Sequence, residues 1–417
     1  MTHEGDDAAR ATAEAVARRS YGRLIAFLAA RTGDVAGAED ALSEAFTAAL
    51  LHWPREGTPV SPEAWLVAVA RRKLIDTARR HRSGEAVVPQ LQFLNEELAA
   101  AQSAAQLSDD RLPLMFACAH PAIDTAIRAP LILQVVLGFD AATIASAFLA
   151  APATMGQRLV RAKARIRQAG IPFRIPEPPE FPTRLGAVLD AIYAVFAEGW
   201  SDPAGTETMR RNLAEDGIWL GRLVASLLPG EPETVGLLAL MLHAEARRSA
   251  RRNAAGDYIP LGEQDPALWD AAMMAEAESL LLRASTKGAI GRYQLEAAVQ
   301  SAHAVRRRSG RTDWAAVVDL YDALWALTES PVVALNRAIA IAEALGPVAG
   351  LAALQSLAED ARLSDYQPYW AARAQLFART GEVAAAEQAY QQAIGLERDP
   401  AVRRFLQRRQ AALRGGR

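Results

Sequence analysis

The chain has few of the residues that several classes of protein and site require. Its 417 residues include one cysteine, Cys118, which excludes an intramolecular disulfide framework and any metal cage made of cysteine alone. The six histidines are scattered and form no H-E-x-x-H pair. No run approaches the about 18 uninterrupted apolar residues of a membrane span, and the N-terminus is acidic and polar. We therefore expect a soluble, cytoplasmic protein without membrane contact.

The net charge is close to zero, but the charge is unevenly distributed. The 46 Lys and Arg residues nearly balance 48 Asp and Glu residues, which excludes a uniformly basic nucleic-acid coat protein. Residues 71–82 nevertheless contain six Lys or Arg and one acid, and residues 158–174 contain six and no acid. One such run is most simply a solvated helix face. Two runs, each closing a helical unit, require a joint explanation.

Almost the whole sequence predicts helix, so we expect an all-α fold. Ala, Leu, Glu and Arg dominate, apolar residues recur at helical spacing, and no alternating strand pattern persists. Five prolines in residues 171–182 forbid helix and predict a semi-rigid connector. Residues 83–112 form a second, weaker boundary, a net-acidic linker. Its acids are Glu85, Glu96, Glu97, Asp109 and Asp110.

The last hundred residues predict helix pairs. One pair begins at Asp313 and a second at Tyr369, with a turn at Gly381 and an Asp399-Pro400 end. The second pair has small residues where paired helices would approach, and aromatic residues that would fill the gaps between pairs. Its length fits the tetratricopeptide (TPR) repeat of about 34 residues. Because the first copy is degenerate, we predict a TPR-like region rather than a regular array.

Residues 138–167 predict a helix-turn-helix. Ile144, Ala145 and Phe148 form the apolar face of a short helix, and a turn at 149–151 follows. Pro152 is tolerated in the first turn of a second helix. The predicted buried face of that helix is Met155, Leu159, Ala162 and Ile166, and its cations project away from this face. This is the arrangement of a DNA-reading motif, although any amphipathic helix pair could mimic it.

At these residues the sequence resembles the extracytoplasmic-function (ECF) sigma factors, the promoter-selecting subunits of bacterial RNA polymerase. The matches are Ile144-Ala145, Thr154, Met155, Arg158, Leu159, Arg161 and Ala162. Upstream, residues 38–50 and 62–82 resemble the polymerase-binding helix and the minus-ten-element helix of the same family. Residues 109–123, 198–205, 262–270 and 291–304 resemble signatures of a subgroup with a long TPR-like C-terminal extension.

The resemblance implies two small sigma-type helical domains followed by a helical extension. The expected parts are sigma region 2 (1–82), the acidic linker (83–112), sigma region 4 with the helix-turn-helix (113–170), the Pro-rich connector (171–182) and the TPR-like extension (183–417). The expected partners are core RNA polymerase and promoter DNA, and a regulatory protein that the extension would bind. No cofactor, metal site or catalytic residue is expected.

The resemblance also assigns binding residues in three groups. Glu39, Asp40 and Glu44 would bind the polymerase. The residues expected to contact the minus-ten element are Arg71, Arg72, Lys73, Arg79, Arg80 and Arg82. The residues expected to contact the minus-thirty-five element are Thr154, Gln157, Arg158, Arg161, Lys163 and Arg165.

Two departures from the family pattern affect DNA reading. The family often has asparagine where this chain has Arg72, which leaves the preferred minus-ten bases open. The family frequently has lysine where this chain has Gly156, and glycine in the turn where this chain has Leu149. Gly156 removes a phosphate contact and weakens the helix by roughly 1 kcal/mol relative to alanine. We therefore expect weak affinity for the upstream element.

Two other functional classes remain open from the residues alone. One is a TPR-type peptide-binding scaffold or regulator whose N-terminal helices have lost DNA function; it predicts no polymerase association. The other is an enzyme hidden in the extension, which predicts a deep polar pocket of titratable residues within 183–312. Cys118 and His120 form a single C-x-H without partner ligands, and the chain has no Walker-type loop and no nucleophile elbow. We therefore do not expect an enzyme.

Overall fold

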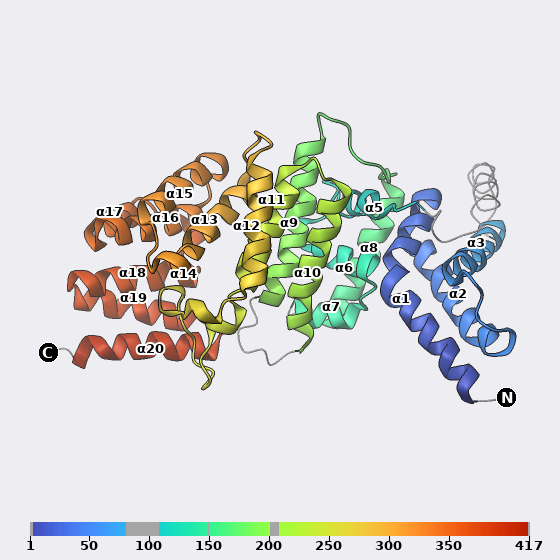
Figure 1. The fold of residues 1–417 in the computed structure, drawn as a ribbon, viewed down its shortest axis with the longest axis horizontal. Helices are drawn as coiled ribbons and strands as arrows, with labels where there is room; N and C mark the ends of the chain where they lie inside the picture. The colour runs from blue at the N-terminus through green and yellow to red at the C-terminus, as the bar shows by residue number, and fades with distance from the viewer. Residues whose placement is uncertain (1–2, 81–107, 149, 201–207, 416–417) are drawn as a thin grey trace. The chain divides into compact units, whose positions relative to one another are not determined.

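The computed structural model describes residues 3–80, 108–148, 150–200 and 208–415. Within these ranges the chain is helical and contains no strand, which confirms the predicted all-α class (Figure 1). The chain divides into two compact units, residues 1–195 and 196–417. The boundary lies inside a helix rather than at residue 183, where we expected the extension to begin.

The first unit consists of helices that pack around one apolar core. They are α1 (His3–Thr32), α2 (Val35–Glu56), α3 (Pro62–Arg80), α5 (Arg111–Cys118), α6 (Thr125–Leu137), α7 (Ala141–Ala147), α8 (Pro152–Gln168) and the first part of α9 (Phe181–Trp200). Its largest fully buried side chains are Leu24, Ile25, Leu28, Leu42, Leu66, Leu114, Met115, Phe116, Leu131 and Ile132. They come from α1, α2, α3, α5 and α6, so the predicted regions 2 and 4 share this core.

The contact between α1 and α6 brings two backbones together. A Cβ atom placed on Gly22 of α1 would lie 1.9 Å from the carbonyl oxygen of Val136 in α6, so only glycine fits there. At the end of α6, Gly138 has φ +77° and lies against the ring of Tyr21. Arg31 at the end of α1 donates to Asp110 just before α5, at 2.9 Å. The end of the predicted acidic linker is therefore attached to α1.

Two expected boundaries move by a few residues. The helix α5 begins at Arg111, inside the predicted linker, because the carbonyl of Asp110 accepts the amide of Leu114. The rest of that linker, residues 83–107, lies outside the described residues. The helix α9 begins at Phe181, because Pro182 is tolerated in a first helical turn. Arg184 of α9 is buried and donates to the carbonyl of Phe116 at 2.8 Å, which fixes this end of α9 in the first unit.

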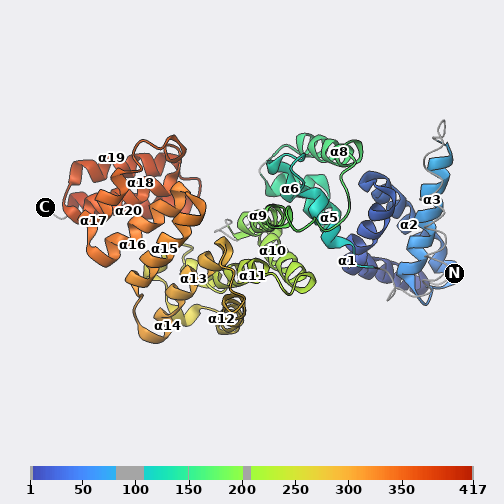
Figure 2. The same ribbon diagram turned by 90° about the horizontal axis from the view of Figure 1, so that it is seen from above.

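The second unit is a succession of helix pairs. Its helices are α10 (Thr208–Leu227), α11 (Pro232–Glu245), α12 (Ala271–Ser285), α13 (Arg292–Ala304), α14 (Arg306–Ser309), α15 (Trp314–Thr328), α16 (Pro331–Leu345), α17 (Pro347–Gln355), α18 (Gln367–Thr380), α19 (Val383–Leu396) and α20 (Pro400–Gly415). The pairs α15–α16 and α18–α19 are where the sequence predicts them, and the partners lie side by side in Figures 1 and 2. Ala374, Ala389 and Tyr390 are buried between α18 and α19, as their spacing predicts.

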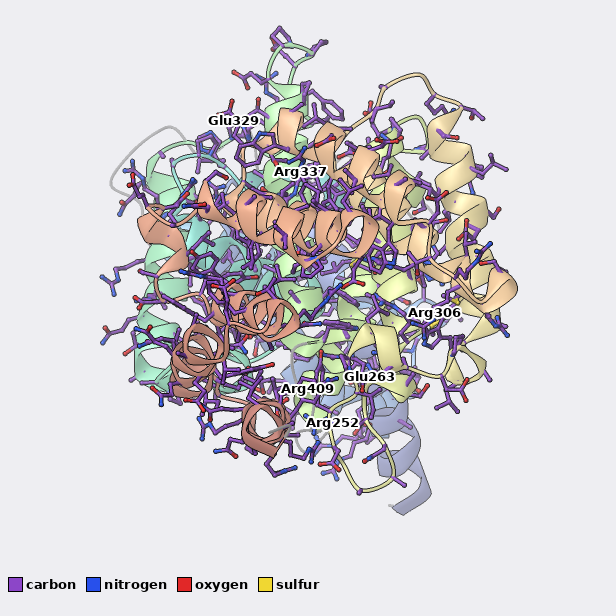
Figure 3. All side chains as sticks on the ribbon, turned by 90° about the vertical axis from the view of Figure 1, so that its left-hand side faces the viewer. Arg252, Glu263, Arg306, Glu329, Arg337 and Arg409 are labelled. Carbon is purple, nitrogen blue, oxygen red and sulfur yellow. The ribbon has the colours of Figure 1, made fainter. Side chains whose placement is uncertain are left out.

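A polar loop is fastened to the C-terminal helix of the second unit. Arg252 donates to Asp399 at 2.7 Å, Arg408 donates to Asp257 at 3.0 Å, and Arg409 pairs with Glu263. Figure 3 shows Arg252, Glu263 and Arg409 close together at the edge of this unit. Because three cation–carboxylate pairs join one loop to α20 and to Asp399, the residue before it, the loop and α20 form one structural element.

His243 is a buried titratable group in the same unit. Its side chain is fully buried in α11, and neither ring nitrogen has a hydrogen-bond partner among the described residues. Burial, reinforced by the charge of Arg247, lowers the pKa of His243 to about 4. The imidazole is therefore neutral at pH 7. The 3.6 Å approach of its Nε2 to Glu278 is then not an ion pair.

We expect His243 to make the second unit less stable in acid. Between pH 6.5 and about 4 the unfolded chain binds a proton at His243 and the folded chain does not, so the free energy of unfolding falls as the pH falls. The loss over that range is on the order of 3 kcal/mol. Urea unfolding should show that His243→Leu gains stability relative to the wild type between pH 7 and 4.5. His52→Leu, at an exposed histidine, is the control. A parallel pH dependence of His243→Leu and the wild type would contradict this assignment.

Candidate nucleic-acid interface

The helix α8 has a buried stripe and an exposed cationic face. Met155, Leu159, Ala162 and Ile166 are buried, which confirms the face that the spacing predicts. On the other side Arg158, Arg161 and Arg165 are exposed. Among the described residues, no acidic side chain pairs with any of these three. Thr154 and Gln157 are exposed at the start of the same helix. This face can therefore offer guanidinium and amide groups to phosphates and base edges.

The helix α7 positions α8, and an aspartate fixes the start of α7. The carboxylate of Asp140 accepts the amides of Ala142 and Thr143 at 2.9 Å and the Thr143 hydroxyl at 2.7 Å. The bonds from Thr143 lower the pKa of the Asp140 carboxyl. Ile144 and Ala145 of α7 are buried and the Phe148 side chain is partly buried, whereas Leu149 in the turn lies outside the described residues. The two helices thus form a fixed pair.

Lys163 differs from the other predicted DNA-binding cations of α8. Its Nζ donates to the carboxylate of Glu39 in α2, and the Lys163 side chain is only 11% exposed. Burial raises the pKa of the Glu39 carboxyl, and the charge of Lys163 offsets this effect only in part. A residue predicted to bind DNA and a residue predicted to bind polymerase therefore contact each other.

The other two predicted polymerase-binding acids are exposed on α2. Asp40 points to solvent. Glu44 forms an ion pair with Lys73 of α3, a predicted minus-ten residue, at 2.6 Å. About half of each of these two side chains is exposed, so solvent screens the ion pair and the pair adds little stability. The acids do lie on one helix, as their spacing predicts.

The predicted minus-ten cations occupy the second half of α3. Arg72 and Lys73 are exposed, whereas Arg71 is only partly exposed. Burial, together with the charge of Arg72, lowers the pKa of Arg71, and its Nε and Nη2 atoms have no partner among the described residues. Arg79 and Arg80 belong to α3, but their side chains are not described, and Arg82 lies outside the described residues. Only part of this predicted surface is therefore defined.

Two features of the charged surface do not follow from the sequence motifs. Asp34 caps α2 by accepting the amide of Gly37, and its other oxygen accepts a hydrogen bond from Arg167 of α8 at 3.0 Å. A third basic run closes the chain, since α20 carries several arginines and no acid. Arg408 and Arg409 of this run pair with the loop described above. The absence of acids after Asp399 was the available signal for this run.

The groups considered for catalysis are held in a local turn or buried in the helical core. The ring of His120 accepts the amide of Ala122 in a local turn, and Cys118 is buried, with its thiol pKa raised by burial. Within 183–312, His243, Arg247 and Glu278 come together where α11 packs on α12 and α13. The expectation that the chain is not an enzyme stays a prediction.

Two family models match separate segments of the chain. Residues 16–84, which include α2 and α3, match Sigma-70 region 2. Residues 184–285 match a family of unknown function, DUF6596. The chain is 41% identical over 365 residues to the uncharacterized protein R00370 of Rhizobium meliloti (strain 1021), and the alignment covers 86% of each chain. No solved structure matches the chain.

The N-terminal match indicates the role of this part of the chain. A Sigma-70 region 2 domain supports a sigma-factor-like role in transcription initiation and implies interaction with core RNA polymerase and promoter DNA. Over most of its length the chain belongs to the family that includes the rhizobial protein R00370. Within the described part of the chain, no helix has both the length and the apolar character that a membrane crossing requires.

We expect the cap on α7 to support the helix pair. Asp140→Ala removes the one oxygen that accepts both amides, so thermal unfolding should report a loss of about 1 kcal/mol. Asp140→Asn keeps an acceptor oxygen and should stay close to the wild type. If the Asn and Ala variants lost equal stability, the cap assignment would be wrong.

Proposed function

We propose that the chain is an ECF-type sigma factor that directs core RNA polymerase to specific promoters. In this proposal α2 docks on the polymerase, α3 holds the minus-ten element, and α7 and α8 read the minus-thirty-five element. The chain itself makes and breaks no bond, because the polymerase performs the chemistry. It would need no metal or cofactor.

The exposed face of α8 is the observation that carries this proposal. Arg158, Arg161 and Arg165 lie on a helix whose opposite face is anchored by four buried residues, so the cations are held in a fixed row. Such a row suits phosphates and guanine edges in a major groove. The same unit contains the Sigma-70 region 2 match, and one chain with both surfaces can bind two promoter elements.

The second unit would be a TPR-like module that regulates or supports initiation. The helix pairs α15–α16 and α18–α19, with small residues between partners, support this assignment. The partner of such a module would be a regulatory protein. We propose no enzymatic role for it.

Run-off transcription with purified core polymerase on a genomic promoter library tests the proposal. The wild type should yield promoter-specific transcripts. Arg158→Ala/Arg161→Ala should reduce them about tenfold or more, because a good arginine–base contact favours the correct base over a wrong base by about 1–3 kcal/mol. DNA binding should also weaken steeply with salt, since each neutralised phosphate releases counterion.

The double variant Arg174→Ala/Arg283→Ala is the matched control. It removes the same charge from exposed positions outside α8 and should transcribe like the wild type. If the wild type bound no polymerase and produced no specific transcript, the scaffold alternative would replace the sigma-factor proposal. An equal loss in both double variants would show that total charge matters rather than the face of α8.

A further inference from the structure

Two arginines of the second unit have only neutral partners. Arg247, just after α11, donates from Nε to the carbonyl of His243 at 3.2 Å and from Nη2 to the side-chain carbonyl of Gln300. Arg251 donates to the carbonyl of Trp200 at 2.7 Å and lies over the Trp200 ring, 3.7 Å from its centroid. Among the described residues, neither guanidinium forms an ion pair with a carboxylate.

The neighbouring arginines show the usual arrangement. Arg248 pairs with Glu245 at 2.6 Å, and Arg252 pairs with Asp399 at 2.7 Å. The same short segment therefore provides counter-ions for two of its arginines and, within the described part of the chain, leaves the other two without one.

The backbone brings a hydroxyl group next to Arg251. Tyr258 forms an antiparallel bridge with Arg252, and the amide of Ile259 donates to the carbonyl of Arg251 at 2.8 Å. The Tyr258 ring packs edge-to-face on Phe405 of α20, with 5.5 Å between the centroids. Tyr258 is partly exposed, so its hydroxyl is a donor that a ligand can reach.

The helix α13 brings an imidazole to Arg247. Gln300, which accepts the hydrogen bond from Arg247, lies one helical turn before His303. The side chains of Arg247 and His303 are each partly exposed, as is that of Arg251. We call the group of donors formed by these elements the cationic cluster, and its members are Arg247, Arg251, Tyr258 and His303.

The cationic cluster has a net positive charge at pH 7. Burial, reinforced by the charge of Arg251, lowers the pKa of Arg247 to about 10, and burial also lowers the pKa of Arg251. Burial, together with the charges of Arg247 and Arg306, lowers the pKa of His303 to about 4. Both arginines of the cluster are therefore charged and His303 is neutral. A largely buried charge without a counter-ion is costly, so a bound anion would stabilise this part of the fold.

We propose that the cationic cluster binds the phosphoryl group of a small molecule. Two guanidinium groups offer planar pairs of N–H donors that match phosphate oxygens, and the Tyr258 hydroxyl and a ring N–H of His303 add neutral donors. Tyr258 and Phe405 also line a hollow of about 280 Å³, which gives room for the organic part of a phosphate monoester. This inference does not depend on the proposed function, because its test measures binding rather than transcription.

Equilibrium dialysis of the full chain against radiolabelled inorganic phosphate tests the site. At a constant ionic strength of about 0.15 M, Arg247→Met should bind phosphate at least tenfold more weakly than the wild type, because it removes one guanidinium. Tyr258→Phe keeps the ring on Phe405 and should bind several-fold more weakly. If both variants bound phosphate as tightly as the wild type, the cationic cluster would not be the site.

Phenyl phosphate distinguishes the two sources of a phosphoryl group. Tighter binding of phenyl phosphate than of inorganic phosphate would assign the hollow beside Tyr258 to the organic group of a monoester. Equal affinity, with the same loss in Arg247→Met, would identify free phosphate as the ligand. Equally tight binding of acetate would overturn the phosphoryl assignment.

Thermal unfolding separates a ligand-binding arginine from a structural one. Without phosphate, Arg247→Met should be at least as stable as the wild type, because it removes a buried cation that has no counter-ion. Saturating phosphate should raise the melting temperature of the wild type by about 5 °C and leave that of Arg247→Met unchanged. Arg248→Met is the matched control: it breaks the pair with Glu245, so it should be less stable in both buffers and keep the phosphate shift. Equal destabilisation of Arg247→Met in both buffers would overturn the proposal.

Discussion

The close approach of α1 and α6 at Gly22 is the constraint on which the first unit depends. With a hydrogen in place of a side chain, the backbone of α1 reaches the carbonyl of Val136, and the cores of the two predicted sigma regions merge. Packing in the merged core places α8 against α2, where Lys163 binds Glu39 and Arg167 binds Asp34. A single glycine therefore sets which charged surfaces are free and which are covered. The packing at Gly22 therefore determines both the conformation of the first unit and which of its charged faces are exposed.

The charged residues of this unit have two possible sets of partners. Inside the chain, carboxylates of α2 neutralise part of α8, whereas Arg158, Arg161 and Arg165 stay exposed. In a promoter complex, phosphates and the polymerase would take over the covered part. Because intramolecular and intermolecular partners have the same chemistry, the balance between them is set by small free-energy differences.

Local patterns predicted the helices and their faces, but not the contacts between distant segments. The buried stripe Met155, Leu159, Ala162 and Ile166 follows from helical periodicity, and Pro152 marks the start of α8 correctly. The pairing of Lys163 with Glu39 joins residues more than a hundred positions apart, and neither residue has a local pattern that specifies the other.

Arg71 was expected to face phosphates and is partly buried, because helical spacing does not show how deeply a cation at the edge of a core is covered. Gly22, a glycine within a helix-forming sequence, was an available sign of a close helix contact.

The most direct measurement is the distance between α2 and α8 with and without the close approach at Gly22. Spin labels at Leu51→Cys and Val160→Cys occupy exposed positions, 60% and 63% exposed, away from the α2–α8 contact. Pulsed electron paramagnetic resonance should give one short distance for the wild type and a longer, broader distribution for Gly22→Ala, because the new Cβ separates α1 from α6. A broad distribution in the wild type, or a Gly22→Ala chain that keeps the short distance, would contradict the account.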